Sequence, residues 1–276
     1  MDIAEALQYG KRELTGSDSP EIDCRVLLCH VLDCQTSYLH AWSDKLLTER
    51  QQTQWHGLIE QRQQGQPVAY LTGQRGFWTL DLKVTSDTLI PRPDTELLVS
   101  LALEKLEPKM WVVDLGTGSG AIALSLASEQ PSSRIVATDF SMAALTVAQD
   151  NMMIHQLHNV FFWQGSWLAA AADSSFDMVI SNPPYIEANN IHLSQGDLRF
   201  EPLSALISGA DGLDDIRLIV KGAQRCLKSG GWLMVEHGYD QAEKIRALFN
   251  RSGFNNVSSR QDFGGNDRVT MGRVGV

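Results

Sequence analysis

Apolar residues recur at the spacing of a helix in the first part of the chain and at the spacing of strands further on. Between residues 24 and 32 apolar side chains recur at helical intervals behind Ser19-Pro20-Glu21, a typical helix start with proline in the first turn. Thr48 and Gln51 have the spacing of a capping box, and a second apolar stripe follows them. Because this segment shows no paired residues of catalytic type, we predict a helical recognition or packing domain over residues 1–70.

A two-residue alternation replaces the helical spacing after that. Apolar side chains between residues 77 and 84 include an alternating run that is typical of a strand or hairpin. Ile90-Pro91-Arg92-Pro93-Asp94 interrupts it, and a new helix is expected from Asp94 onward. We therefore predict a β-hairpin linker over residues 71–92.

The rest of the chain alternates short apolar runs with helical patterns, which is the arrangement of a parallel, doubly wound sheet. Strands are expected at residues 111–115, 134–139, 160–164, 176–181 and 232–236, with helices between them. Residues 257–262 and 268–273 flank Gly264-Gly265-Asn266 and are predicted to form a terminal antiparallel hairpin. The prediction is an α/β domain over residues 93–276 with a seven-stranded, mostly parallel sheet.

Composition narrows the classes of function. The chain carries 23 Lys and Arg against 33 Asp and Glu, a net charge of -10 that disfavours tight nonspecific binding to nucleic acid. No window has the apolar length of a membrane span, and the N-terminus lacks the basic and apolar regions of a signal peptide. The four cysteines form no Cys-x-x-Cys pair, so we expect reduced thiols in a cytoplasmic protein and predict no metal site.

The first chemical motif lies where the first of these strands is expected to end. Asp114-Leu115-Gly116-Thr117-Gly118-Ser119-Gly120 closes the strand and opens a helix. Its glycines allow a tight turn and the close approach of a ligand, and the free N–H groups of the helix start can bind an anion. Asp139 ends the second strand about 20 residues later, where a carboxylate can accept both hydroxyls of a ribose. The pairing predicts a nucleoside cofactor.

Two cofactors fit this motif. Gly116, Gly118 and Ala121 satisfy the dinucleotide pattern G-x-G-x-x-G/A, so NAD stays a possibility. Two features favour S-adenosylmethionine: Asp114, two residues before the first glycine, can meet the ammonium of its methionine part, and the third glycine comes one place early. The pattern Asp-x-Gly-x-Gly-x-Gly resembles the signature of class I methyltransferases.

A second motif, Asn182-Pro183-Pro184-Tyr185, follows the fourth expected strand. Its prolines fix φ and remove two N–H donors, so the strand ends in a rigid corner with exposed carbonyl oxygens, one amide side chain and one aromatic ring. Such a corner suits a planar –NH2 group, because the oxygens accept its two hydrogens while Tyr185 packs on its flat side. A plain strand-ending turn is the alternative, since Asn-Pro is a common turn pair.

Both motifs can meet at one ligand site. In a doubly wound sheet, ligands bind at the carboxyl ends of the strands near the topological switch point. The glycine turn and the Asn182 corner meet there if the first and fourth strands are neighbours. A corner of this kind facing a methyl donor resembles the one found in methyltransferases that modify planar nitrogens. These nitrogens are the exocyclic amines of adenine or guanine and the side-chain amide of glutamine.

Four further segments resemble one family. They are Pro67-Val-Ala-Tyr-Leu-Thr-Gly73, Phe77-Trp78, Ile90-Pro-Arg-Pro-Asp-Thr-Glu96 and Arg199-Phe-Glu-Pro202. With the two motifs, they make residues 23–271 resemble the protein-(glutamine-N5) methyltransferases, specifically the release factor enzymes of the PrmC or HemK type. The resemblance implies a helical domain joined by a hairpin to a Rossmann-like class I methyltransferase domain. It also implies methylation of the glutamine in the Gly-Gly-Gln motif of class I peptide chain release factors.

The resemblance also implies roles for single residues. Those assigned to the cofactor are Asp114, Gly116, Thr117, Gly118, Ser119, Gly120, Asp139, Ser166, Trp167 and Asn182, with Asp139 on the ribose and Trp167 near the adenine. Asn182, Pro183, Pro184 and Tyr185 would hold the substrate glutamine, and Asn182, Pro183 and Tyr185 would act in catalysis. The family usually has Asp where this chain has Ser166, so a carboxylate that could accept the adenine amino hydrogens is missing there. Arg75-Gly76-Phe77 likewise stands where the family has Arg-Glu-Phe.

The predicted mechanism follows from the amide. Its nitrogen is a poor nucleophile because the lone pair is delocalised into the carbonyl. Accepting its hydrogens at the Asn182 side-chain oxygen and the Pro183 carbonyl raises electron density on nitrogen and aims it at the methyl group, so in-line positioning supplies most of the rate. We interpret Glu236-His237, after the fifth strand, as a structural pair.

Three other functions stay open at this point. An adenine-N6 DNA or RNA methyltransferase would use a similar corner, but the acidic charge and the lack of a basic target-recognition domain count against it and against any direct nucleic-acid partner. A ribosomal protein glutamine is an alternative substrate. A nucleoside-binding interaction module without catalysis is the third, and the Asn182 corner argues against it. No membrane partner is expected.

Overall fold

The computed structural model describes residues 1–275. Its contacts divide the chain into two compact units, the first made of residues 1–74 with 192–200 and the second of residues 75–191 with the chain from 201 onward. The boundaries that we predicted at residues 70 and 92 stay a prediction. Among the described residues, no helix is both long and apolar enough to cross a membrane.

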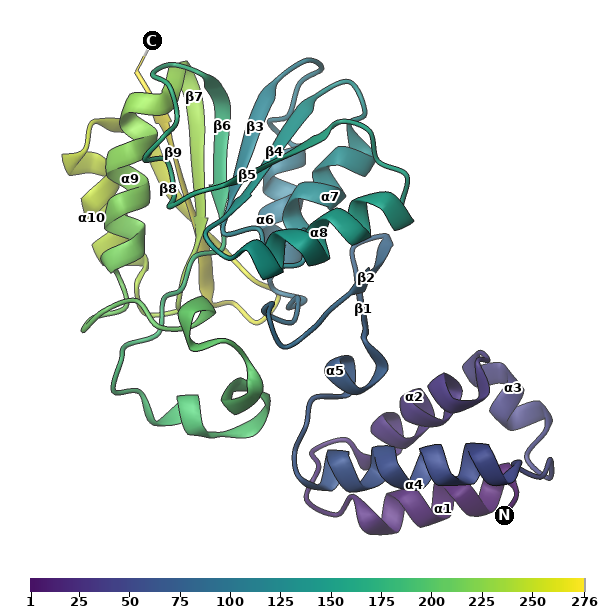
Figure 1. Ribbon diagram of the computed structural model, residues 1–276. Helices are drawn as coiled ribbons and strands as arrows, with labels where there is room; N and C mark the ends of the chain where they lie inside the picture. The colour runs from purple at the N-terminus through teal and green to yellow at the C-terminus, as the bar shows by residue number, and fades with distance from the viewer. Residues whose placement is uncertain (276) are drawn as a thin grey trace. The chain divides into compact units, whose positions relative to one another are not determined.

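Five helices build the N-terminal part of the first unit (Figure 1): α1 (Ile3–Glu13), α2 (Pro20–Leu32), α3 (Thr36–Ala41), α4 (Glu49–Gln63) and α5 (Val68–Thr72). The capping box predicted at α4 is present, because the Gln51 N–H donates to Thr48 Oγ1 at 3.3 Å and the Thr48 N–H donates to Gln51 Oε1 at 2.9 Å. A second capping box, which we missed, starts α1 at Asp2 and Glu5.

The start of α2 differs from the prediction in one detail. Pro20 occupies the first turn as expected, but the Ser19 side chain makes no capping hydrogen bond. Its hydroxyl donates instead to Asp23, at 3.0 Å, and Asp23 is buried against Arg62 of α4 in an ion pair of 2.7 Å. The Ser19 hydroxyl thus bonds a side chain one turn further along α2 and not a free N–H of the helix start.

The predicted hairpin is confirmed. Strands β1 (Gln74–Phe77) and β2 (Leu80–Lys83) form a separate two-stranded sheet. The Lys83 N–H donates to the Asn151 side-chain oxygen at 2.7 Å, which fixes the end of β2 to the second unit's helix α8 (Met142–Ile154). Helix α6 (Thr95–Leu103) follows the Pro-rich stretch, as predicted.

The second unit is the predicted α/β domain. Its strands among residues 1–275 are β3 (Trp111–Leu115), β4 (Arg134–Asp139), β5 (Val160–Gln164), β6 (Phe176–Ser181), β7 (Leu227–Glu236), β8 (Phe254–Gln261) and β9 (Asp267–Val274). They lie in the order β5-β4-β3-β6-β7-β9-β8; β9 pairs antiparallel with both β7 and β8, and the other neighbouring pairs are parallel. The seven-stranded, mostly parallel sheet with a terminal hairpin is therefore confirmed.

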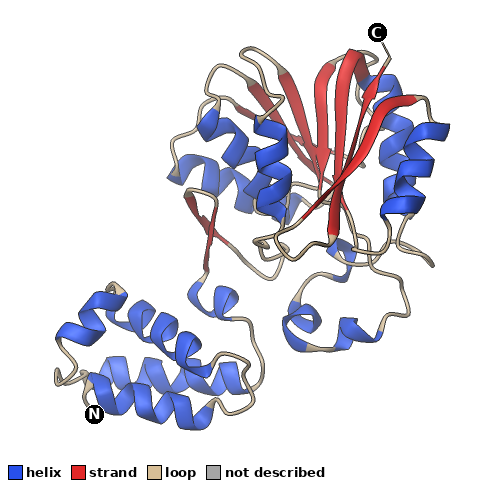
Figure 2. Cartoon of the chain, turned by 180° about the vertical axis from the view of Figure 1, so that it is seen from behind, coloured by secondary structure: helices blue, strands red, loops and turns tan. Residues whose placement is uncertain are grey.

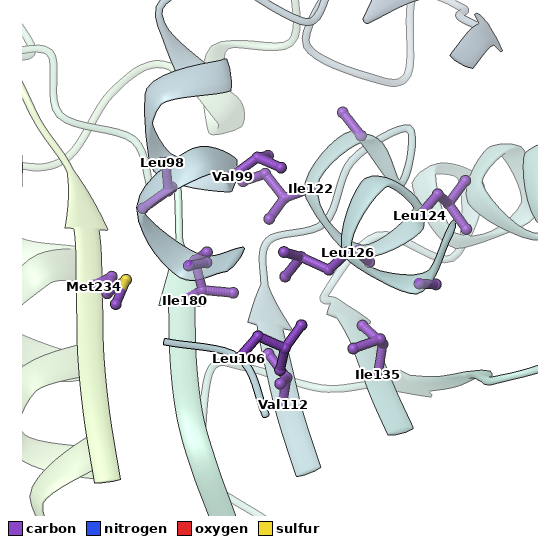
Figure 3. Close-up of a cluster of buried hydrophobic side chains, with 14 of the residues drawn as sticks. Leu98, Val99, Leu106, Val112, Ile122, Leu124, Leu126, Ile135, Ile180 and Met234 are labelled. Carbon is purple, nitrogen blue, oxygen red and sulfur yellow. The ribbon is translucent and has the colours of Figure 1, made fainter. Parts of the chain in front are cut away.

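Helices cover both faces of this sheet (Figure 2). Helices α6, α7 (Ala121–Glu129) and α8 lie on one face, and α9 (Asp214–Cys226) and α10 (Ala242–Arg251) on the other. Side chains such as Val99 and Ile122 pack against Ile180 of the sheet (Figure 3). The connection from β6 to α9 carries three short 3-10 turns, Ile191–Ser194, Gly196–Phe200 and Leu203–Ala205.

One pairing within the sheet positions the site. β3 lies next to β6 in parallel, with Leu115 opposite Ser181, and β4 lies on the other side of β3. The chain order reverses between β3 and β6, so this is the topological switch point. The condition set by the sequence, that the first and fourth strands of the domain are neighbours, is met.

Candidate active site at the carboxyl ends of strands β3 and β6

The glycine turn after β3 has the backbone that only glycine adopts easily. Gly116, Gly118 and Gly120 have φ of 70°, 55° and 87°, in the left-handed region. A Cβ on Gly116 would also stand 3.3 Å from the ring of Trp167. The Thr117 N–H donates to the Thr138 carbonyl at 2.8 Å, which joins the turn to β4, and α7 begins at Ala121.

One of the two buried carboxylate oxygens of Asp114 lacks a hydrogen-bond partner among the described residues. Its Oδ2 accepts from the Thr117 hydroxyl at 2.6 Å and from the Ala123 N–H at 3.2 Å. Its Oδ1 has no hydrogen-bond partner among residues 1–275. Burial raises the pKa of Asp114 to about 7. Since an unpaired buried oxygen is costly, this atom suits a cationic ligand such as an ammonium group.

Asp139 is held by backbone donors. The Gly118 N–H donates to its Oδ2 at 3.0 Å, and the Ser141 N–H to its Oδ1 at 2.9 Å. Burial raises the pKa of Asp139, and these N–H groups oppose that shift. Each carboxylate oxygen keeps a second lone pair, so the group can still accept hydroxyl hydrogens.

A cavity of about 450 Å³ opens where these groups meet, a size ordinary for a small-molecule site. Seven of the predicted residues line it: Gly116, Gly118, Asp139, Ser166, Trp167, Asn182 and Pro184. Six predicted residues do not line it, although each lies within two positions of one that does: Asp114, Thr117, Ser119, Gly120, Pro183 and Tyr185. The two motifs that the sequence singled out therefore share one cavity.

Sequence reasoning missed the remaining lining residues. They are Ser86, Asp87, Thr88, Leu89, Phe140, Ser141, Ala144, Gly165, Pro202, Ser204, Ala205 and Asp215. Phe140 could have been found, because it directly follows Asp139 and is exposed. The segment of Pro202 to Ala205 follows Glu201, whose carboxylate bonds Arg92 at 2.6 Å and the Ile90 N–H at 3.2 Å. These contacts of Glu201 join residues far apart in the chain, so no local pattern in the sequence predicts them.

A carboxylate lies beside Trp167 although Ser166 lacks one. The Trp167 indole N–H donates to Asp215 Oδ1 at 3.0 Å, and the Ser208 hydroxyl donates to Asp215 Oδ2 at 2.7 Å. Asp215 comes from the first turn of α9 and lines the cavity. A carboxylate from a distant element thus lies next to Trp167, whose preceding residue, Ser166, lacks one.

The Asn182 corner is held at its Tyr185 end through its backbone. The Tyr185 carbonyl accepts from Gln241 Nε2 at 3.0 Å, and a Cβ on Gly212 would stand 2.2 Å from that same oxygen. Gly212, with φ of 71°, therefore has to be glycine. The Tyr185 side chain is partly buried, and burial raises the pKa of its hydroxyl.

The Asn182 side chain is held by two distant residues. Its Nδ2 donates to Thr95 Oγ1 at 3.1 Å. The carboxyl of Glu236, buried at the end of β7, lies beside Asn182, because the preceding residues Ser181 and Val235 are opposite each other in β6 and β7. Hydrogen bonds from Thr95 and Asn182 lower the pKa of Glu236, but burial outweighs them and raises it to about 7.

His237 is a structural residue, as interpreted. One ring nitrogen lies 2.8 Å from the Gly238 carbonyl and the other 2.8 Å from Thr270 Oγ1, so both positions are used. Burial lowers the pKa of His237, which keeps the ring neutral. The interpretation of Glu236 missed its contact with Asn182. No group of His, Cys, Asp and Glu within residues 1–275 could hold a metal ion.

Comparisons with known proteins agree on the class of the chain. Residues 5–73 match the family described as PrmC N-terminal domain, and residues 93–197 match the family described as Methyltransferase small domain. The chain is 48% identical over 277 residues to "Release factor glutamine methyltransferase" of Aliivibrio fischeri, covering 99% of this chain and 98% of that protein. A protein of the same name from Xylella fastidiosa (strain Temecula1) is 50% identical over 254 residues, or 91% and 92% of the two chains. The solved methyltransferase of Pyrococcus furiosus has the same fold, with a TM-score of 0.56 and 15% identity over 80% of this chain and 98% of that one.

Proposed function

This chain belongs to the release factor glutamine methyltransferases, and from that premise we propose how its site works. It is an S-adenosylmethionine-dependent methyltransferase that acts on the side-chain amide nitrogen of a glutamine in peptide chain release factors. We propose that the target is the glutamine of the Gly-Gly-Gln motif in class I factors. The observation that carries this is the shared cavity, which both Asn182 and Asp139 line.

The cofactor half of the site fits S-adenosylmethionine. We propose that the unpartnered Oδ1 of Asp114 meets the ammonium and that Asp139 accepts the ribose hydroxyls. Trp167 and Phe140 offer aromatic surface for the adenine, and Asp215 offers an acceptor for its amino hydrogens. When bound, the cofactor supplies an electrophilic methyl group on a sulfonium sulfur.

The corner holds and orients the amide. Asn182 uses its –NH2 group toward Thr95 and Glu236, which leaves its Oδ1 as the atom that can face a ligand. We propose that this oxygen and the Pro183 carbonyl accept the two amide hydrogens of the target glutamine. Both acceptors are fixed before the substrate arrives, so positioning costs little on binding and the nitrogen lone pair is aimed at the methyl donor. Tyr185 would pack on the flat side of the amide.

A protein substrate is favoured over nucleic acid. The chain's net charge is -10, whereas a surface that tracks phosphates needs clustered Lys and Arg. We propose no direct nucleic-acid or membrane partner. The cysteines within residues 1–275 are all free thiols, as expected in a reducing compartment, and we propose the cytoplasm.

A methyl-transfer assay tests the function. Labelled S-adenosylmethionine is offered with a class I release factor, a ribosomal protein and DNA as separate substrates, and the products are mapped by mass spectrometry. We expect one methyl group on the Gly-Gly-Gln glutamine. A release factor with Glu in its place lacks the –NH2 donors, and one with Asn has a shorter reach, so neither should accept the methyl group. Methylation of the Glu form would mean carboxyl chemistry, and label on DNA would favour the adenine alternative.

A further inference from the structure

The Asn182 amide can work only in one of its two orientations. Its carbonyl oxygen must face the substrate for it to accept an amide hydrogen, whereas a rotation by 180° would present the –NH2 group instead. Oxygen and nitrogen of the amide have nearly the same shape, so the surrounding hydrogen bonds decide between the two. Thr95, which lies 87 residues away in the sequence, accepts a hydrogen bond from the Asn182 side chain at 3.1 Å.

The Thr95 hydroxyl alone cannot select one orientation of the Asn182 amide, because a hydroxyl both donates and accepts. A carboxylate next to it removes the ambiguity, since an ionised carboxylate only accepts. Glu236 is that carboxylate: it lies beside Asn182, because the preceding residues Ser181 and Val235 are opposite each other in β6 and β7. Hydrogen bonds from Thr95 and Asn182 oppose the rise of its pKa. When Thr95 donates to this carboxylate, its hydroxyl has to accept from Asn182, so the –NH2 group faces inward.

We propose that Glu236 and Thr95 are positioning residues that set the orientation of the Asn182 amide and so make the corner an acceptor for the substrate amide. The proposal rests on the function proposed above and adds the means by which the corner is polarised. Glu236 is 1% exposed, and its Oε2 has no partner among residues 1–275. A buried carboxyl with a spare oxygen is costly for the fold, which calls for a reason to keep it.

Protonation of Glu236 would weaken this control. A protonated carboxyl can donate to Thr95, and the Thr95 hydroxyl can then donate to Asn182, which admits the unproductive orientation. The groups around Glu236 are Asp94 next to Thr95 at the start of α6, Tyr185 after β6 and Arg268 on β9. His237, the next residue on its own strand, is held neutral by burial. Arg268 forms ion pairs with Asp94 at 3.5 Å and Asp262 at 3.3 Å, so only part of the positive charge of Arg268 acts on Glu236.

The first test removes the Thr95 hydroxyl. Thr95→Val keeps the shape of the side chain, and we expect turnover on the release factor to fall by about tenfold to a hundredfold, with KM for S-adenosylmethionine unchanged. Thr95→Ser restores the hydroxyl and should recover most of the loss. Thr270→Val is the control, because it removes a buried hydroxyl that bonds His237 and not Asn182. Thermal unfolding and cofactor titration show that each variant is folded.

The second test is a pH profile. Wild-type turnover should fall on the acid side as Glu236 is protonated, with a midpoint near the pKa of about 7. Glu236→Gln cannot ionise in this range and carries an –NH2 donor, as the protonated carboxyl carries an O–H donor. It should therefore lose the acid limb by staying at the low acid-side turnover at every pH, as should Glu236→Leu. An unchanged acid limb in Glu236→Gln would overturn the role of Glu236.

The outcomes also separate this proposal from the function on which it rests. Wild-type protein that does not methylate the release factor would remove the function itself. Active wild-type protein with Thr95→Val turnover within about twofold of it would leave the function and overturn the inference. An equal loss in Thr95→Val and Thr270→Val would do the same, because it would assign both hydroxyls a structural role only.

Discussion

The two halves of the active site are held in place by different kinds of bond. In the cofactor half, Asp139 receives backbone N–H groups from Gly118 and Ser141, and Asp114 receives one from Ala123. In the substrate half, Asn182 depends on the side chains of Thr95 and Glu236, which come from other elements of the fold. One half is thus preorganised mainly by the course of the chain, with one side-chain bond from Thr117 to Asp114, and the other by a buried side-chain network.

This difference determines how each half fails. A substitution does not remove a backbone N–H, so the glycine turn loses function mainly when its conformation is lost. A side-chain network loses its geometry when any member is changed, because the remaining buried polar groups are left without partners. We therefore expect single substitutions to reduce turnover in the substrate half and affinity in the cofactor half.

The largest expected effect is at Asn182. Asn182→Ala removes the acceptor for the substrate amide, and we expect turnover to fall by about 10²–10³, the usual loss when one preorganised polar contact to the reacting group is removed. Its affinity for S-adenosylmethionine, measured by calorimetry, should stay within about twofold of wild type. A variant that turns over normally would show that the site is misassigned. A variant that loses cofactor binding would show that Asn182 also belongs to the cofactor half.

The cofactor half has its counterpart at Asp139. Asp139→Ala should weaken S-adenosylmethionine binding by about tenfold to a hundredfold, since a hydrogen bond to a charged group is worth roughly 1.5–3 kcal/mol. Turnover at saturating cofactor should change less than in Asn182→Ala. Calorimetry with S-adenosylmethionine and NAD gives the comparison. Unchanged affinity, or tighter binding of NAD, would favour the dinucleotide alternative.

The pH dependence of cofactor affinity gives a third contrast. The raised pKa of Asp114, about 7, means that the group is ionised above pH 7 and increasingly protonated below it. An ammonium prefers the ionised form, so affinity should fall by about tenfold per pH unit once the pH is well below 7. Asp114→Asn should bind more weakly and show a flat profile between pH 5.5 and 7.5. A wild-type affinity that does not change over this range would contradict the pairing of Asp114 with the ammonium.

The smallest effect is expected at Asp215. Asp215→Ala removes the partner of the Trp167 indole N–H, and we expect a loss of affinity of a few-fold, because both oxygens of this carboxylate already bond Trp167 and Ser208 and act on the cofactor mainly through the Trp167 ring. Asp214→Ala is the matched control: Asp214 is the preceding residue in α9 and bonds Arg217 at 2.7 Å, away from the cavity. Equal affinity in the two variants would mean that Asp215 does not stand in for the carboxylate missing at Ser166.

The sequence by itself determined the features that depend on a few neighbouring residues. Glycine spacing predicted the turn at Gly116 to Gly120, the two prolines predicted the corner at Asn182, and alternating apolar runs predicted the strands. These signals are local, because backbone dihedrals and side-chain periodicity are set within one or two turns of the chain. Helix α1 escaped although its capping box at Asp2 and Glu5 is a local signal that we did not use, and α3 is only 6 residues long, with Leu39 as its buried residue.

Only the tertiary structure decided which groups surround the two motifs. Thr95 and Glu236 meet Asn182 because α6 and β7 both pack beside β6, and Asp215 meets Trp167 because α9 begins next to the cavity. Each of these contacts joins residues that lie 48 or more positions apart. Contacts over such separations follow from the order of strands in the sheet and from how the helices cover it, and a single sequence records neither in any local pattern.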